Sequence, residues 1–434
     1  MNIRPFQIVL LGVFGFLAIA AVFFFATSQG SSSNNQQAYG ESVIIWGTLS
    51  SSAFQNVFNE IIVDDKAFQV VRYIQKDART FDFEFINAIA EGRAPDLIVL
   101  PSQSIVTHRE KLVAIAPETI STRTFRDSYI DGAEIFIFTD GIYGVPFAVD
   151  PLVMFWNRDL LSSAGLASAP KTWTEVQDAV VPSLTVLNAS LVPTQSGIAF
   201  GEYANIRNAK PILSLLLLQT GTSIVSEENQ RYTITLGERS SSALPPADAA
   251  LSFYTRFGIA SQPQYSWSRS LPEDRQKFVG GTLGLYFGFG SEYQTIVNSN
   301  PNLNFDVAPV PQDAGATVKR NFGTIYAFAI PRAAGNKSGA FAVAETLAGP
   351  AASDYLTDGL GLSPALRSVI AQGATDPYRQ TLLSSALITR AWLDPNPEES
   401  ENVFKLMIED VTSGRSRVSE AIEDAIGRLE LLFR

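Results

Sequence analysis

After a polar N-terminal stretch, hydrophobic positions fall into short blocks of two kinds. Residues 43–47, 68–74 and 97–100 form compact apolar runs typical of buried strands, whereas residues 54–62 and 81–91 show the spacing of amphipathic helices. This order of strand, helix, strand, helix and strand predicts a mainly parallel sheet covered by helices. The pattern therefore predicts an α/β fold.

Two polar loops follow the first and the third of these strands. They read TLSSS at residues 48–52 and PSQS at residues 101–104, so both are neutral and rich in hydroxyl groups. Ligands of parallel sheets bind beyond the carboxyl ends of the strands. We therefore name Trp46, Ser51 and Gln103 as candidate ligand-binding residues, although each loop alone is equally consistent with an ordinary polar turn.

The stretch from residue 142 to residue 173 is the most informative part of the sequence. Its first half is apolar as far as Trp156 and is interrupted only by two prolines and Asp150, which predicts two short buried strands joined at a crossing between two lobes. An isolated carboxylate between apolar strands is costly unless it is paired. Asp150 is therefore expected either to cap backbone N–H groups or to face a wet cleft.

Two helices are predicted to follow this crossing. Asn157 is placed to cap the start of the first helix. Thr172 and Glu175 have the spacing of a capping box at the start of the second. The chain then enters a second α/β unit.

The middle of the chain continues the alternation of strands and helices. Residues 197–200 predict a strand, and residues 211–218 and 247–257 predict helices. Tyr203 lies where the strand hands over to a helix, which is a usual position for a cleft residue. Trp267 lies in a polar loop, where a core anchor and a stacking platform for a ligand are equally consistent with the sequence.

Aromatic residues gather after a further predicted strand at residues 283–287. Gly288 and Gly290 allow close turns there, which would expose Phe289 and Tyr293. Each of these rings is a candidate stacking surface for a ligand. For any single ring, a place in the hydrophobic core is the plainer interpretation.

An apolar run of 19 residues without charge occupies positions 8–26, preceded by Arg4. Such a run is long enough to cross a bilayer as a helix, and the positive flank places its N-terminal end in the cytoplasm and the rest of the chain outside. A cleavable signal peptide is the alternative, because small residues suited to a cleavage site end the run. We expect an uncleaved single-pass anchor within residues 1–28, followed by a flexible tether at residues 29–40.

The composition argues against several classes of protein. A net charge of −11 without a lysine or arginine cluster gives no nucleic-acid surface. With no cysteine, one histidine and neither a nucleophile-elbow nor a P-loop motif, the sequence supports no catalytic site of those types, no metal site and no cofactor. The single histidine, His108, reads as part of a solvated surface helix. Paired carboxylates for glycoside hydrolysis stay open, because their spacing is set in three dimensions.

Four short motifs follow one another around the predicted crossing: YGVPFAVD at residues 143–150, FWNRDL at 155–160, AGL at 164–166 and PKTW at 170–173. In this order they resemble bacterial extracellular solute-binding proteins of the maltose-binding type. Further motifs extend the resemblance over nearly all of the chain after the tether, namely APD at residues 94–96, NFGTIYAFAIP at 321–331 and GLSP at 361–364.

The resemblance implies a two-lobed, periplasmic-binding-protein-like fold of type II, in which three crossings join the lobes. For this chain it implies an N-terminal lobe of residues 41–149 and 327–368, and a C-terminal lobe of residues 150–326 and 369–434. The N-terminal transmembrane helix would precede both lobes. The lobes would then lie on the extracellular or periplasmic side of the cell membrane.

The resemblance also implies a function. Such proteins bind a small solute, for which we expect a sugar or oligosaccharide here. They act as monomers that deliver the solute to the permease subunits of an ABC importer, without catalysis. In sugar-binding relatives an aromatic side chain near Phe289 stacks on the ligand, and a tryptophan lies near the position of Trp392. Relatives often carry charged residues in the two loops that are neutral here, so they do not identify the sugar.

The sequence thus yields one set of candidate ligand-binding residues: Asp150, Trp392, Phe289, Tyr203, Trp46, Ser51, Gln103, Tyr293 and Trp267. Two alternatives to import stay open. One is a module that senses a ligand for a membrane receptor, and the other is an extracellular carbohydrate-active enzyme.

Overall fold

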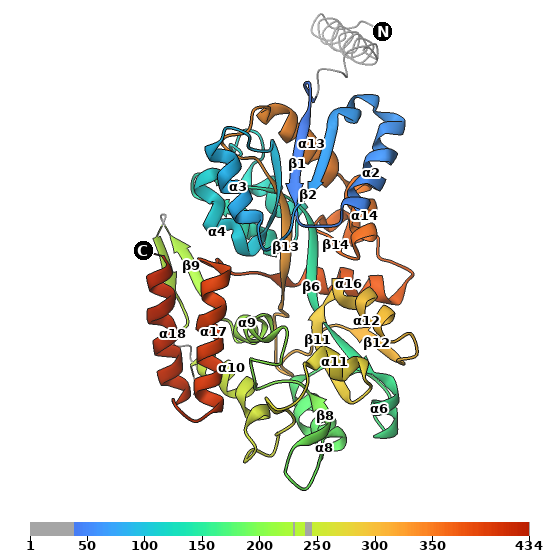
Figure 1. The fold of residues 1–434 in the computed structure, drawn as a ribbon, viewed down its shortest axis with the longest axis vertical. Coiled ribbons are helices and arrows are strands. Elements are labelled where there is room, and N and C mark those ends of the chain that lie inside the picture. The colour runs from blue at the N-terminus through green and yellow to red at the C-terminus, as the bar shows by residue number, and fades with distance from the viewer. Residues whose placement is uncertain (1–38, 229–230, 239–244, 434) are drawn as a thin grey trace, which may run out of the picture.

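The computed structural model describes residues 39–228, 231–238 and 245–433, which form two lobes stacked along the long axis of the molecule (Figure 1). Each lobe has its own cluster of buried hydrophobic side chains. No helix within the described ranges combines the length and apolar character needed to cross a bilayer. The predicted anchor at residues 8–26 lies outside those ranges.

The N-terminal lobe is built on the parallel strands expected from the first hydrophobic blocks. β1 (Val43–Gly47) pairs in parallel with β2 (Val71–Gln75) on one side and with β3 (Leu97–Pro101) on the other. Parallel strands end at the same edge, so the loops after β1 and β3 lie together. The helices of this lobe are α2 (Ser51–Asp64), α3 (Phe81–Ala90), α4 (Ile105–His108), α5 (Thr122–Ser128), α13 (Lys337–Ala348), α14 (Pro350–Leu360) and α15 (Arg367–Ile370), with short 3-10 turns at η2 (Lys66–Val70), η3 (Ser102–Ser104), η4 (Arg109–Lys111) and η5 (Asp131–Phe136).

One strand runs through both lobes. β6 (Val145–Asn157) is buried along almost its whole length. Its first part pairs antiparallel with β13 (Asn321–Ala329) as far as Pro151, and its last part pairs with β11 (Leu283–Phe289) and with β12 (Phe305–Ala308). The prediction of two short strands was wrong here, because the chain changes partners at Pro151 while staying extended.

β13 is the second connection between the lobes. It pairs with β3 on one edge and with β6 on the other, and its first two residues also pair with β15 (Thr389–Arg390). Its register with β6 shifts so that Phe147 becomes the extra residue of a bulge beside Pro146. A proline has no N–H to donate, so a bulge is a suitable place for it. β14 (Ser363–Pro364) also pairs with β6.

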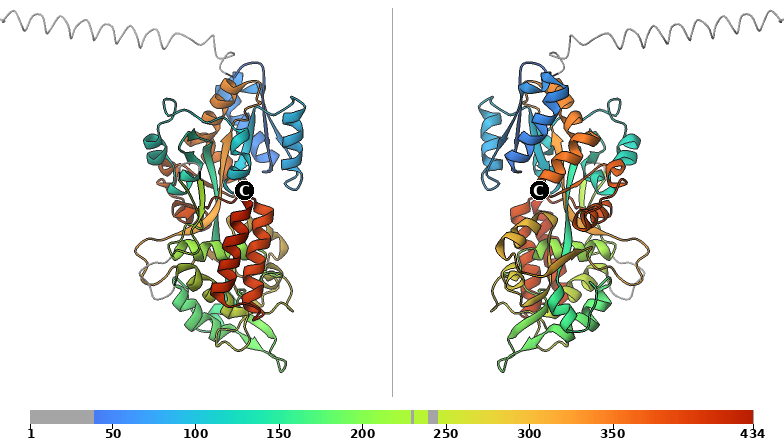
Figure 2. Two further views of the ribbon diagram at one scale, coloured as in Figure 1. Left: turned by 90° about the vertical axis from the view of Figure 1, so that its left-hand side faces the viewer. Right: turned by 90° about the vertical axis from the view of Figure 1, so that its right-hand side faces the viewer.

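The C-terminal lobe extends the same sheet. β11 pairs in parallel with β8 (Pro193–Ile198), β7 (Val186–Leu187) lies at the edge, and β9 (Val225–Glu228) forms a separate hairpin with β10 (Arg231–Ile234). In Figure 2 the last two helices lie side by side along this lobe. Its helices are α6 (Arg158–Ser163), α7 (Trp173–Glu175), α8 (Val181–Leu184), α9 (Ala209–Gln219), α10 (Pro246–Thr255), α11 (Asp274–Val279), α12 (Tyr293–Ser299), α17 (Pro397–Thr412) and α18 (Val418–Leu432).

The third connection is α16 (Pro377–Leu387). Its Leu382 packs in the core of the C-terminal lobe, whereas Leu383 packs in the core of the N-terminal lobe. Both lobes therefore share one helix as well as two strands.

The structure confirms the predicted N-caps at two helix starts. The Leu160 N–H donates to the Asn157 side chain at 3.0 Å, and the Glu175 N–H donates to the Thr172 hydroxyl at 3.1 Å. Each cap satisfies an N–H group that the helix itself leaves without a partner.

The expectation of a solvated His108 was wrong. The ring is fully buried, its Nε2 lies 2.9 Å from Oδ1 of Asp82, and it packs edge-on against Phe85. The charges at Arg109 and Glu110 suggested exposure, but α4 is a single turn whose last residue points onto α3. The neighbours in sequence therefore say little about the burial of this ring.

Gly323 tests how tightly the two crossing strands are joined. A Cβ added at Gly323 would lie 2.6 Å from the Asp150 carbonyl oxygen and 2.9 Å from the Pro151 Cα. Because only backbone movement can relieve this clash, Gly323→Ala should lower the free energy of unfolding by about 1–3 kcal/mol. Urea denaturation of the full chain measures the change.

Gly427→Ala in α18 is the matched control, since no atom outside its own helix lies within 4 Å of the added Cβ. Alanine is favoured over glycine in a helix by roughly 1 kcal/mol, so this variant should be as stable as the parent or more so. If Gly323→Ala also matched the parent, the close crossing would be contradicted.

Candidate ligand-binding cleft

Two cavities lie between the lobes and share one wall. The wall is the segment of residues 390–393, and Ala391 and Trp392 line both cavities. We call the cavity that includes Gln103 and Phe289 the binding cleft. We call the cavity that includes Arg320 the hinge groove.

The binding cleft takes side chains from both lobes and from the strand between them. Gln103 comes from the turn after β3 in the N-terminal lobe, whereas Lys210 at the start of α9 and Phe289 at the end of β11 come from the C-terminal lobe. The cavity has a volume of about 210 Å³. Its other walls are formed by Ser102, Pro211, Phe322, Thr324, Ala391, Trp392, Asp394, Pro397 and Glu401.

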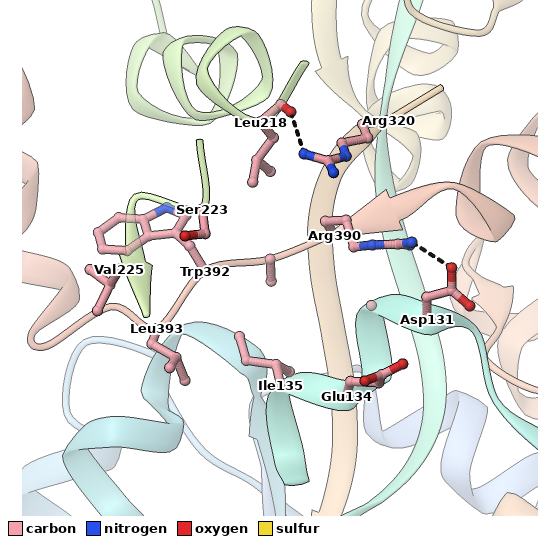
Figure 3. A pocket seen from close by; sticks show the side chains of 12 residues that line it. Asp131, Glu134, Ile135, Leu218, Ser223, Val225, Arg320, Arg390, Trp392 and Leu393 are labelled. Atoms are coloured by element: carbon pink, nitrogen blue, oxygen red, sulfur yellow. Dashed lines mark hydrogen bonds and ion pairs between the residues drawn. The ribbon is translucent and has the colours of Figure 1, made fainter. Parts of the chain in front are cut away.

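Figure 3 shows the Arg390 and Asp131 side chains paired at one side of the hinge groove. Arg390 and Arg367 both contact the Asp131 carboxylate. Burial opposes ionisation of Asp131, but the two guanidinium groups hold its pKa below its usual range. Arg320 donates to the Leu218 carbonyl at 3.0 Å. The contact with Asp131 ties Arg390 to the N-terminal lobe.

A buried polar network forms one wall of the binding cleft. The Lys210 ammonium lies 2.7 Å from Asp394 Oδ2 and donates to the Ser400 hydroxyl at 2.7 Å and to the Pro397 carbonyl at 3.2 Å. The Ser400 hydroxyl in turn donates to Asp394 at 2.7 Å. Buried charges are tolerated only with such partners, so this pair fixes the start of α17 against α9.

Glu401 extends this network toward the cleft. Its Oε2 lies 3.8 Å from the Lys210 ammonium, and its Oε1 accepts a hydrogen bond from the Tyr203 hydroxyl. Burial, and then the contact with Glu401, raise the pKa of Tyr203 well above its usual range. Tyr203 therefore acts as a hydrogen-bond donor at this position.

Four of the predicted site residues meet at the binding cleft. Gln103, Phe289 and Trp392 line it, and Tyr203 reaches it through its hydrogen bond to Glu401. Trp392 is only 4% exposed. Its Nε1 donates to the Ser214 hydroxyl at 3.2 Å, and its ring stacks on Phe404, so it forms part of the floor of the cleft.

Asp150 lies behind the cleft wall and not on its surface. It is buried, and it accepts hydrogen bonds from the Ser291 N–H at 3.0 Å and the Ser291 hydroxyl at 2.6 Å. Of the two roles expected from the sequence, the structure shows the capping role. Asp150 thus holds the turn after Phe289 against the crossing strand.

The remaining four predicted residues do not line the binding cleft. Trp46 packs under the Lys76 ammonium, 3.8 Å from the ring centroid, and Ser51 lies exposed at the start of α2. Tyr293 stacks on Tyr378, with ring centroids 4.1 Å apart. Trp267 is fully buried, and its Nε1 donates to Asn205 at 3.0 Å. Its ring is therefore a core anchor in this conformation.

Sequence reasoning missed the polar wall of the cleft. Lys210 is a lone cation in a strongly apolar helix, which was a signal that a buried partner had to exist. The partner, Asp394, lies 184 residues away in the sequence, and no local pattern links the two. No group of three or more histidine, cysteine, aspartate or glutamate side chains in the described ranges is arranged to hold a metal ion.

The sequence is similar to known solute-binding proteins. The family model described as bacterial extracellular solute-binding protein matches residues 73–354. The diacetylchitobiose-binding protein DasA of Streptomyces coelicolor is 22% identical over 173 residues, which span 39% of this chain and 36% of that protein.

Two solved structures are similar to the whole fold. A cyclo/maltodextrin-binding protein complexed with maltotetraose has a TM-score of 0.71 at 14% identity and covers 90% of this chain and 97% of its own. The protein CpMnBP1 with mannotriose bound has a TM-score of 0.65 at 18% identity and covers 90% of this chain and 100% of its own. Both likenesses show the two-lobed type II fold.

Asp150 should give the protein a measurable dependence of stability on pH. Burial raises its pKa from 3.8 to about 7, against the opposing effect of the Ser291 hydrogen bonds. The folded state therefore holds this proton more tightly than the unfolded state, so the stabilisation is complete below about pH 4 and is lost as the pH rises toward 7.

Asp150→Asn keeps the shape of the protonated acid and does not titrate. Its free energy of unfolding, minus that of the parent, should rise between about pH 4 and pH 7 and then stay level. Urea denaturation across this range measures the difference, in which other titrating groups cancel. A difference that does not change with pH would contradict the assignment.

Proposed function

Because this chain belongs to the bacterial extracellular solute-binding protein family, we propose that it captures a sugar or oligosaccharide between its lobes and delivers it to the permease subunits of an ABC importer. The observation that carries the proposal is the binding cleft, whose walls come from both lobes. A solute held there contacts both lobes at once. Binding then favours the conformation in which the lobes are together.

The lining of the cleft suits a sugar. Phe289 and Phe322 offer half-buried aromatic faces, while Gln103, Thr324 and Glu401 offer polar groups. A sugar ring has an apolar C–H face and a rim of hydroxyl groups, so it needs both kinds of surface. The maltotetraose and mannotriose ligands of the two structural neighbours, and the name of the diacetylchitobiose-binding relative, support the same class of ligand.

The hinge is provided by β6, β13 and α16. Away from these elements, the described residues join the lobes through the Asp131–Arg390 ion pair and through two long hydrogen bonds: the Thr107 hydroxyl donates to the Pro395 carbonyl at 3.3 Å, and Arg109 donates to the Tyr232 hydroxyl at 3.5 Å. Bonds of this length contribute little. Contacts with the solute can therefore decide the balance between open and closed states, and the permease would recognise the closed one.

We further propose that the chain is tethered outside the cytoplasmic membrane. The uncharged run at residues 8–26 supports an anchor, and the polar stretch that follows would give the lobes a reach of about 20 Å. A tethered binding protein stays close to its permease, which raises the local concentration of the loaded form.

Thermal unfolding of the full chain against an oligosaccharide panel tests the proposal. The chain is kept in a detergent without a sugar headgroup, and the panel includes maltotetraose, mannotriose and diacetylchitobiose. A ligand at a hundred times its dissociation constant stabilises the native state by about 2.7 kcal/mol, which raises the midpoint by several degrees. Calorimetric titration then gives the dissociation constant for each sugar that causes a shift.

Phe289→Ala should weaken the binding of that sugar by about 1–3 kcal/mol, because it removes an aromatic face of the cleft. Phe83→Ala is the matched control, since Phe83 is 71% exposed on α3 and lies outside the cleft. A panel without any stabilising sugar, or equal affinities in both variants, would count against sugar binding at this site.

A further inference from the structure

The charges that line the binding cleft do not cancel. Three of the lining residues are charged, and they are Lys210, Asp394 and Glu401. One cation and two carboxylates leave a net charge of −1 on the wall. Whatever solute enters the cleft must therefore be compatible with an excess negative charge.

Lys210 and Asp394 neutralise each other, and the hydrogens of the Lys210 ammonium group are all used within the protein. The ammonium group has three hydrogens, and they are matched by three acceptors on Asp394, Ser400 and Pro397. Asp394 accepts in addition from the Ser400 hydroxyl and from the Asn396 N–H. Lys210 has no hydrogen left for a solute, so it offers no anchor for an anionic ligand, and the Asp394 side chain is only 4% exposed.

Glu401 is the group that remains available. Its side chain is 48% exposed, and its Oε1 is taken by Tyr203. Its Oε2 is 3.8 Å from Lys210, beyond hydrogen-bonding distance, and no donor in the described part of the chain bonds to it. An ionised carboxylate accepts hydrogen bonds and donates none. Glu401 Oε2 is therefore free to accept a hydrogen bond from a donor group on the solute.

We propose that the binding cleft selects oligosaccharides with a protonated amino group, such as glucosamine oligomers, over neutral sugars and over sugars that carry a carboxylate or a phosphate. This inference rests on the proposed function as a sugar-binding protein. The ammonium group would donate to Glu401 Oε2, and the aromatic rings of Phe289 and Phe322 line the same small cavity. Aromatic faces attract cations, and hydrogen bonds to a charged partner are stronger than neutral ones.

Calorimetric titration of the full chain at about pH 6 tests the selection, because a carboxylate is ionised and a primary amine is protonated there. Three trimers are compared within one linkage series, β-1,4 or α-1,4, whichever binds. They are the glucosamine trimer, the glucose trimer and the glucuronic acid trimer. Relative to glucose, each glucosamine ring carries an amine in place of the 2-hydroxyl, and each glucuronic acid ring carries a carboxylate in place of the C6 hydroxymethyl group. We expect the glucosamine trimer to bind at least tenfold more tightly than the glucose trimer, and the glucuronic acid trimer to bind least.

Glu401→Gln removes the charge but keeps an acceptor for Tyr203, and it should reduce the preference for the amine to threefold or less. Glu399→Gln, an exposed position outside the cleft on the same helix, should keep the full preference. Thermal unfolding checks that both variants fold.

Equal binding of the glucosamine and glucose trimers to the parent, or an unchanged preference in Glu401→Gln, would overturn the inference and leave sugar binding in place. If no trimer of either series binds, the inference fails, whereas the proposed sugar function fails only if the oligosaccharide panel also gives no stabilising ligand.

Discussion

The antiparallel pairing of β6 with β13 is the constraint on which the rest of this structure depends. The two strands pass through the boundary between the lobes with their backbone groups paired, and Gly323 allows them to approach closely there. Three parts of the binding cleft are attached to this ladder through strand pairing. Gln103 follows β3, which pairs with β13, and Phe289 ends β11, which pairs with β6. The segment with Trp392 follows β15, which also pairs with β13.

Buried charged side chains then hold the cleft walls in place relative to the β6–β13 ladder. Asp150 holds the turn after Phe289 from within β6, and Lys210 with Asp394 holds α17 against α9. Such groups are costly to bury and are weak evidence for stability in themselves. Their effect here is to fix the positions of two cleft walls, so that Glu401 and Phe289 face a cavity of defined shape. The same residues thus serve the fold and the site.

The sequence was sufficient for the parts of the fold that depend on local pattern. The parallel strands of the N-terminal lobe, the caps at Asn157 and Thr172 and the helices predicted at residues 54–62, 81–91, 211–218 and 247–257 follow from hydrophobic period and capping chemistry. The continuity of β6 could not be predicted in this way, because a proline usually interrupts a strand. Here β6 changes its pairing partner at Pro151, so the missing proline N–H costs no hydrogen bond. At the site, Gln103 and Phe289 were found from strand ends. The Lys210 and Asp394 pair was not found, since only the folded chain brings together residues so far apart in the sequence. Trp267 shows that an aromatic residue in a polar loop can still belong to the core.

The central claim is that the two lobes close around a solute, and a distance across the cleft tests it most directly. The chain has no cysteine, so spin labels can be placed at two chosen positions. Ala78, between β2 and α3, and Thr295, on α12, are exposed residues on opposite lobes. With a sugar that raises the unfolding temperature, the distance between the two labels should shorten and its distribution should narrow. A distribution that is the same with and without the bound sugar would contradict the account.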